Sequence, residues 1–397
     1  MAVLTARERY QAVMRFQPGV RTLLWEYAYW NGAVERWYHE GLQRSATSQP
    51  PGMPSGEVFH GEGLPWPARS GRCCYRDVDI HRLLDLDEGT GRIPVNWRCS
   101  PPFEKVVLDE DETTQVLIDS DGARVQVRKD RDSLPHPLEW PVRDWATWQK
   151  LKEERFGVDV RARLPDRWEE VSQTYGQRDY PLGVIVHGLF GLPRDLMGLV
   201  AQCTMYYTEP KLMHDVSEHL TSVFLAVLEE VCARVDLDFV YVWEDLAYKN
   251  GPLISPWLFD EFIVPYYKRL TGFLRARGID IVCVDTDGDF RLLIPGFLEG
   301  GVTGFYPFEV MAGMDVVAVR KEYPQLHIQG GLDKTKLAAG KASIDSELEA
   351  KLPYMLSQGG YIPFCDHLVP PDVSWESFLH YRTRLREYVE KYPSTRR

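Results

Sequence analysis

The sequence lacks the charge pattern of a nucleic-acid-binding protein. It contains no lysine-rich or arginine-rich tract, and 46 basic residues face 58 acidic ones, for a net charge of −12. A surface of this sign repels a polyanion. We therefore expect no nucleic-acid partner.

Long apolar runs and paired cysteines are missing as well. No uninterrupted apolar stretch approaches the roughly 20 residues that span a bilayer, and residues 1–15 lack the hydrophobic core of a signal peptide. The seven cysteines are scattered and form no C-x-x-C pair, so neither a disulfide framework nor a cysteine-rich zinc module is indicated. These absences predict a cytoplasmic protein without membrane attachment.

A regular alternation of apolar strands and amphipathic helices is present instead, mainly from residue 181 onward. Buried strands that alternate with helices pair in parallel. Seven such strands in 397 residues predict a TIM-type (β/α)8 barrel with one strand unrecognised. A doubly wound open sheet is the alternative, but no G-x-G-x-x-G follows any strand. The expected strands are 22–25, 181–187, 238–244, 279–284, 302–306, 326–329 and 361–364.

Residues 45–140 interrupt this alternation. Their first half is rich in proline, glycine and serine, which predicts irregular structure. The stretches 103–108, 113–118 and 123–127 then alternate between apolar and polar residues, with acidic turns between them, and predict an antiparallel β meander. We expect an insertion laid over a single barrel domain, 1–397, rather than an independent domain.

The stretch 281–290 joins a buried strand to three acidic residues around a glycine. Side chains two apart on a strand face the same way, so Asp285 and Asp287 project together. Asp287, Gly288 and Asp289 could instead turn the chain and cap the next helix. In barrels of this type the active site lies at the carboxyl ends of the strands, which favours a chemical role for Asp285 and Asp287.

Most of the other expected strands also end in a polar or ionisable residue. We predict His367, Asp285, Asp287 and Glu244 as catalytic residues, because an imidazole that faces carboxylates can transfer protons or bind a metal. Alternatively, His187 is a core histidine, Glu244 and Asp245 cap the next segment, and the early aromatic residues pack a helix against the barrel. The predicted substrate-binding residues are Glu26, Tyr27, Trp30, His187 and Gln329.

Several motifs of the chain resemble the uroporphyrinogen decarboxylase superfamily, which includes porphyrinogen decarboxylases and methyltransferases that exchange methyl groups with corrinoid proteins. The resemblance implies a (β/α)8 barrel and is more specific for the superfamily than for one activity. The motifs lie at residues 7–9, 244–256, 287–289, 307–315, 330–334 and 359–367.

The chain also departs from that resemblance. The decarboxylases follow their first strand with an arginine-rich loop that grips substrate carboxylates, whereas residues 24–30 here are acidic and aromatic. In the thiol-methylating members a zinc ion is held by histidine and cysteines, at places that here hold Asp285, Asp287 and His367. The resemblance thus implies a divalent metal, zinc among them, bound by oxygen and nitrogen ligands.

These features favour a methyltransferase that moves a methyl group from a small, aromatic substrate to a corrinoid on a partner protein. The first alternative is a decarboxylase of a carboxylated tetrapyrrole or smaller acid, without a cofactor, and the second is a non-catalytic barrel that binds a metabolite. A homodimer is expected from the superfamily resemblance.

Overall fold

The computed structural model describes residues 4–45, 69–70, 73–74, 77–129 and 135–395. The proline-rich and glycine-rich pieces near residues 50 and 62 lie outside this part of the chain. A curled parallel sheet of seven strands forms its centre, in the order β16-β15-β14-β13-β10-β9-β4. The strands are β4 (Gly91–Arg92), β9 (Leu182–His187), β10 (Phe239–Trp243), β13 (Val282–Asp285), β14 (Gly304–Tyr306), β15 (His327–Gln329) and β16 (Tyr361–Ile362).

Six of the seven expected strands are confirmed, and the strand expected at 22–25 is wrong. That segment makes no backbone ladder and is held by side-chain hydrogen bonds. The Thr22 hydroxyl donates to the Tyr361 carbonyl at 2.5 Å on the β16 side, and the Trp25 indole donates to the Glu88 carbonyl at 2.9 Å on the β4 side. The segment therefore lies between the two outer strands of the sheet without completing it.

Successive side chains of each strand point to opposite faces of the sheet, which divides the core into an inner and an outer part. Phe239 and Tyr241 point into the curl, where they pack with Cys283 and Tyr306, whereas Val240 and Val242 belong to the larger cluster under the helices. This division decides which residues at the strand ends face the interior, because the side chain two positions further along points the same way.

Helix α1 (Ala6–Met14) closes the end of the curl opposite the strand carboxyl ends. A capping box of Thr5 and Glu8 begins it. Its Tyr10 ring lies 5.6 Å from the Trp25 ring and 5.7 Å from the Phe239 ring, inside the inner core. The open end is therefore the one at which the strands terminate.

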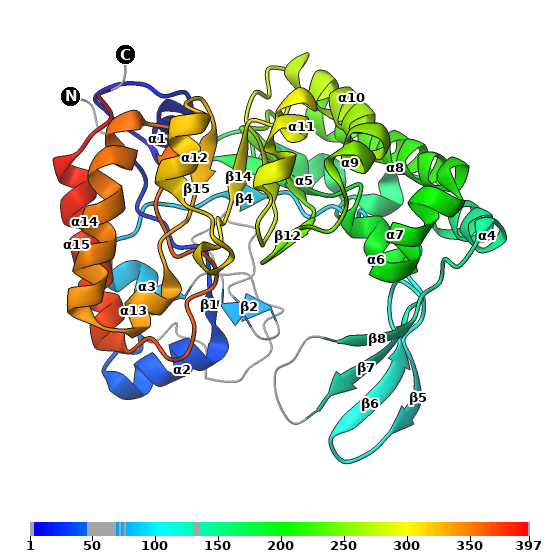
Figure 1. Cartoon of the computed structure of the whole chain (residues 1–397), viewed down its shortest axis with the longest axis horizontal. Helices are drawn as coiled ribbons and strands as arrows, with labels where there is room; N and C mark the ends of the chain where they lie inside the picture. Colours follow the sequence, from blue (N-terminus) through cyan, green and yellow to red (C-terminus); the bar gives the residue numbers. More distant parts are fainter. Residues whose placement is uncertain (1–3, 46–68, 71–72, 75–76, 130–134, 396–397) are drawn as a thin grey trace.

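The outer layer consists of helices that follow the strands and cover the convex face of the sheet (Figure 1). None of the helices in the described ranges is both long and apolar enough to cross a membrane. The layer contains α6 (Gly191–Met197), α7 (Leu199–Thr208), α8 (Pro210–Cys232), α9 (Pro256–Phe262), α10 (Val264–Arg275), α11 (Ile294–Glu299), α12 (Val316–Glu322), α13 (Lys334–Ala338), α14 (Lys341–Gln358) and α15 (Trp375–Lys391).

Further short elements lie around this body. A small antiparallel sheet has the order β1-β3-β2, and β11 pairs with β12. These elements are β1 (Tyr29–Trp30), β2 (Arg69–Ser70), β3 (Cys73–Cys74), β11 (Ala247–Tyr248), β12 (Gly251–Pro252), α2 (Asn31–Glu40), α3 (Val78–Leu83), α4 (Trp145–Arg155) and α5 (Trp168–Thr174).

The antiparallel meander is present and has one strand more than expected. It runs β5 (Val106–Glu110), β6 (Thr114–Ile118), β7 (Arg124–Arg128) and β8 (His136–Glu139), in sequence order. Every residue of β5 and β8 is exposed, and the sheet projects from the body (Figure 1). The expectation that it lies over the main fold is therefore wrong.

Candidate active site

Three aspartates meet at the open end of the sheet, after the neighbouring strands β10 and β13. Asp285 is the last residue of β13 and pairs with Trp243 of β10 and Tyr306 of β14. Asp245 follows β10 with a left-handed φ of +49°, a conformation that costs energy for a side chain other than glycine. The chain thus accepts local strain where it brings acidic groups together.

Asp287 lies next to His367, a side chain with which it can exchange protons. Its Oδ2 atom is 3.6 Å from Nε2 of His367, whereas its buried Oδ1 atom has no hydrogen-bond partner. Burial raises the pKa of Asp287 to about 7, helped by the nearby acids Asp245 and Glu309. A carboxyl group with this pKa is partly protonated at neutral pH.

The turn after Asp287 requires glycine. Gly288 has φ of +78°, and a Cβ atom there would lie 2.6 Å from the backbone of Ala247. This close approach holds the Asp287 turn against the β10 loop. Gly288 therefore turns the chain, as the alternative from the sequence has it. Asp289 pairs with Arg291 at 2.7 Å.

Asp245 and Asp285 are also shifted toward the protonated form. Burial is the main cause of the raised pKa of each. Repulsion from Asp245 and Asp287 adds to the pKa of Asp285, and repulsion from Asp195 adds to that of Asp245. The Arg194 guanidinium, 3.7 Å from Asp245, and the Arg92 guanidinium near Asp285 partly oppose the shifts. Two carboxyl groups in this cluster therefore hold protons more strongly than free aspartates do.

Lys334 lies between two acids, Glu309 and Asp366, that are near Asp287. Its ammonium lies 3.5 Å from Glu309 and 3.7 Å from Asp366. Glu309 in turn accepts a hydrogen bond from the Gly288 amide at 3.1 Å, and Asp366, which is fully buried, accepts one from the Val310 amide at 2.9 Å. Burial raises the pKa of Asp366 to about 6.

The predicted metal ligands do not form a metal site in this arrangement. No group of three or more histidine, cysteine, aspartate or glutamate side chains within the described ranges is placed to hold a metal ion. Asp287 and His367 lie together, but Asp285 does not complete a ligand set with them. The donor geometry therefore does not fit the divalent metal that the resemblance implied, and we assign no step to one.

Glu244 has a different position from the one predicted for a catalytic residue. It is fully buried, and its carboxylate accepts hydrogen bonds from the amides of Leu189, Phe190 and Gly191 at 2.9–3.0 Å. The Tyr267 hydroxyl donates a fourth bond at 2.6 Å. Glu244 therefore points into the helix layer and organises the loop before α6.

Glu26, predicted to bind substrate, is also tied to the protein itself. Its side chain is 1% exposed and pairs with Arg382, which is 2% exposed, at 3.1 Å. It also accepts a hydrogen bond from the Cys365 amide at 2.9 Å, in the loop that carries His367. Glu26 therefore fixes the position of that loop.

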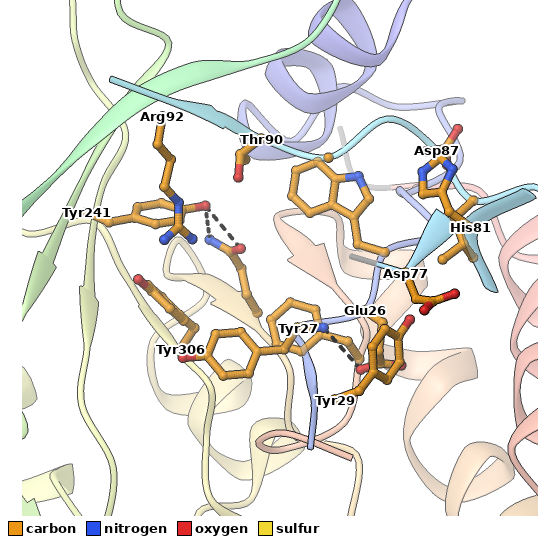
Figure 2. Close-up of a pocket in the computed structure, with 15 residues that line it drawn as sticks. Glu26, Tyr27, Tyr29, Asp77, His81, Asp87, Thr90, Arg92, Tyr241 and Tyr306 are labelled. Atoms are coloured by element: carbon orange, nitrogen blue, oxygen red, sulfur yellow. Dashed lines mark hydrogen bonds between the residues drawn. The ribbon is translucent and has the colours of Figure 1, made fainter. Parts of the chain in front are cut away.

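A cavity lined by aromatic rings lies within the curl of the sheet (Figure 2). Its lining residue Tyr306 pairs with Asp285, which places the cavity next to the aspartate cluster. The Tyr27 ring forms the connection, 5.7 Å from the His367 ring and 6.1 Å from the Tyr306 ring. Gln329 also lines the cavity and donates to the Tyr241 hydroxyl at 2.8 Å. The aromatic lining consists of Trp25, Tyr27, Tyr29, Tyr241, Tyr306 and Phe364.

The remaining two predicted substrate-binding residues do not line this cavity. Trp30 precedes α2 and packs on the core. His187 ends β9 beside the Trp243 ring, at 5.4 Å, and its Nδ1 atom lies 3.4 Å from Arg98. Burial, with a smaller effect of Arg98, lowers the pKa of His187 to about 3, so that its imidazole stays neutral.

Comparison with known proteins agrees with this architecture. The model of the uroporphyrinogen decarboxylase (URO-D) family matches residues 115–388. The chain belongs to the uroporphyrinogen decarboxylase family. Within the superfamily it is a divergent member.

Individual relatives of this URO-D chain are distant. It is 21% identical over 168 residues to the uroporphyrinogen decarboxylase of Myxococcus xanthus (strain DK1622). That match covers 42% of this chain and 45% of the Myxococcus protein, less than half of either. Among solved structures, a methyltransferase from Methanosarcina mazei is similar with a TM-score of 0.57 and 14% identity, over 97% of this chain and 100% of that one. At such identity the structural likeness shows a shared fold.

Three residues of the URO-D site were not predicted from the sequence. Arg92 projects into the cavity from β4, and Asp245 and Lys334 flank Asp287. Asp245 is adjacent to Glu244. Which of the two acids belongs to the site depends on which face of β10 points into the curl of the sheet. Lys334 belongs to the motif at 330–334, so its position in a family motif was the available signal.

Proposed function

We propose that this URO-D protein is a methyltransferase that takes a methyl group from a small aromatic methyl compound and passes it to a corrinoid on a separate protein. The observation that carries the proposal is an aromatic cavity whose Tyr27 ring lies 5.7 Å from the ring of His367, the partner of Asp287. The pKa of the Asp287 carboxyl group is about 7. Aromatic walls suit a flat substrate. Such an acid suits the release of a poor leaving group at neutral pH.

The chemistry needs one proton on the substrate side. In an aryl methyl ether the bond between the methyl carbon and the oxygen breaks, and its electron pair stays on the oxygen. The reduced corrinoid supplies the electron pair that binds the methyl group. Asp287 gives its proton to the oxygen, and His367, 3.6 Å from Asp287, returns a proton from solvent. A phenol leaves.

The decarboxylase alternative has less support from the cavity. Binding a polycarboxylate requires several cations that face the substrate. Among the described residues that line the cavity, the basic ones are Arg92 and His81, and His81 lies at the far side, beside Asp87 (Figure 2). One arginine within the aromatic part of the cavity does not match a substrate with many carboxylates.

The test uses the purified chain, free reduced corrinoid and a panel of methoxyaromatics and methylamines. Methyl transfer is followed by the change in corrinoid absorbance and by the release of demethylated product. We expect turnover with at least one methoxyaromatic and a loss of about 100-fold in Asp287→Asn, as for removal of a general acid. Asp289→Asn is the matched control, since this acid pairs with Arg291. No demethylation with any compound, or loss of carboxylate from uroporphyrinogen, would contradict the proposal.

Three further expectations from the sequence stay predictions. These are the corrinoid-carrying partner, the homodimer and the cytoplasmic location. Sedimentation of the purified chain tests the homodimer, and acceleration of methyl transfer by a corrinoid protein over free corrinoid tests the partner.

A further inference from the structure

Strand β5 of the projecting meander exposes three consecutive apolar side chains. Val106, Val107 and Leu108 are 44%, 47% and 50% exposed. β5 is an outer strand of its four-stranded sheet and lies on the part of the sheet that projects from the body of the molecule (Figure 1). An apolar edge strand that is open to water offers a surface to another chain.

The meander holds this strand in a fixed position. Leu117, Ala123 and Val125 on the neighbouring strands and their turn are buried and form a small core of the meander itself. At its base, Arg98 binds Asp121 at 2.6 Å and thereby ties the β6–β7 turn to the body. β5 is therefore presented on an arm with its own packing, and its exposure is a property of the fold.

The charges that flank the apolar residues differ in sign at the two ends of β5. Lys105 precedes them, and the acidic run 109–112 follows them. Neither Lys105 nor Asp109 has an ion-pair partner among the residues that the structure describes. Within the acidic run, Glu110 is met by Lys129 at 3.3 Å. The strand thus leaves one basic and one acidic side chain available on either side of its apolar centre.

We propose that two copies of this chain associate through β5, with the two strands antiparallel about a two-fold axis near Val107. The apolar residues then cover each other, and Lys105 of each copy faces Asp109 and Glu110 of the other copy. Lys129, which pairs with Glu110, offsets the approach of Glu104 at the same end. A parallel arrangement would bring the two acidic runs together and is disfavoured.

The shape of β5 limits the assembly to two copies. Its register with β6 shifts between Val107 and Asp109, and such a bulge interrupts the edge, so that strands do not add without end. A two-fold contact uses the same surface of both copies and is closed. Because a few half-exposed side chains bury less than the roughly 800 Å² per partner of a standard interface, we expect a weak dimer, with a Kd of about 10 µM.

Sedimentation equilibrium of the full chain between about 1 and 100 µM tests the association. We expect a dimer that forms as the concentration rises. Val107→Asp places a charge at the centre of the contact and should weaken the association at least about tenfold. Leu83→Asp, at a leucine of α3 that is 57% exposed, is the matched control and should leave the dimer unchanged. The Tm of each variant verifies that it is folded.

An exchange of charge tests the antiparallel arrangement. Lys105→Glu and Asp109→Lys each turn attractions at both ends of the contact into repulsions, so each variant alone should associate several-fold more weakly. In an equimolar mixture of the two variants, opposite charges meet at both ends, and mixed dimers should form in preference to dimers of either variant. High salt should reduce these differences.

The inference concerns assembly and stands apart from methyl transfer. A monomer at every concentration would overturn it and would leave the apolar surface to a different protein. A dimer that Val107→Asp does not weaken would place the interface elsewhere, and assemblies larger than two copies would contradict the closed contact. Mixed variants that associate no better than each variant alone would rule out the antiparallel arrangement.

Discussion

Nε2 of His367 lies 3.6 Å from Oδ2 of Asp287, although the two residues come from loops after different strands of the sheet. The His367 loop is held by Glu26, which accepts a hydrogen bond from the Cys365 amide, and the Asp287 turn is held by Glu309 through the Gly288 amide. Glu26 and Glu309 thus help to set the relative position of His367 and Asp287.

The first prediction concerns the pH dependence of methyl transfer. Burial and neighbouring acids raise the pKa of Asp287 to about 7, so its proton-donating form is lost as pH rises through 7. We expect kcat to fall about tenfold per pH unit above that value. Asp287→Asn removes the donor and should give a low, flat profile, measured between pH 5.5 and 9.

Stability provides a second readout for the same carboxyl group. A pKa that is raised on folding means that the folded chain holds the proton more strongly, so stability is lost as pH rises from about 4 to about 7. Asp287→Asn should therefore raise Tm at pH 8 and have less effect at pH 5. Because the side chain is 39% exposed, we expect a gain of only about 1 kcal/mol. A lower Tm at pH 8 in this variant would argue against the raised pKa.

The second prediction assigns Glu244 to stability. Glu244→Ala would leave three buried amides and the Tyr267 hydroxyl without their acceptor, at a cost of about 3 kcal/mol or more. Denaturant unfolding measures the loss. Glu299→Ala, at an exposed pair with Lys268, is the control and should change little. A Glu244→Ala chain that is as stable as the original but inactive would restore the catalytic interpretation.

The sequence predicted the Asp285 and Asp287 positions better than the Glu244 position for a physical reason. Asp285 ends β13 and Asp287 lies in the turn made by Gly288. In such a turn an acidic side chain reaches the open end of the sheet whichever way it points. Strand β10 is apolar and buried on both faces, so its alternation does not say which face is inward. Glu244 therefore looked equivalent to Asp245, and only the fold separates them.

Short strands explain the other differences between prediction and structure. β4 is two residues long, and its Gly91 lies where a Cβ atom would come within 2.3 Å of the Tyr180 ring. A glycine in a proline-rich and glycine-rich region indicates a loop, so Arg92 was overlooked. The stretch 22–25 has the composition of a strand, but side-chain hydrogen bonds, which composition does not reveal, hold it in place.

The third prediction tests the buried pair of Glu26 and Arg382. Arg382→Met leaves a buried carboxylate unpaired and should destabilise the chain by about 3–5 kcal/mol. The double variant with Glu26→Gln should be less destabilised than the sum of the two single variants, because neither charge is then left alone. Denaturant unfolding of the four proteins gives the coupling energy, and simple additivity would show that the pair is not coupled.

The fourth prediction concerns Arg98, which joins the projecting meander to the sheet. Its guanidinium binds Asp121 of the β6–β7 turn at 2.6 Å and Asp195 of α6 at 2.9 Å, and lies 3.4 Å from His187. Arg98→Gln should speed amide hydrogen exchange in residues 114–128, because the turn loses its ion pair with the body. Arg124→Gln, within the meander itself, should not change exchange at Asp121.

His187 gives the readout that separates an electrostatic effect of Arg98 from loosening of the meander. Burial is the main cause of its pKa of about 3 and the Arg98 charge the lesser one, so Arg98→Gln should raise that pKa and still leave it below 6.5. The folded chain then loses stability as pH falls from about 6.5 toward the lowered pKa, since only the unfolded chain binds the proton there. Imidazole proton shifts between pH 3 and 8 measure the change, and ordinary titration near 6.5 in Arg98→Gln would mean that Arg98, and not burial, keeps His187 neutral.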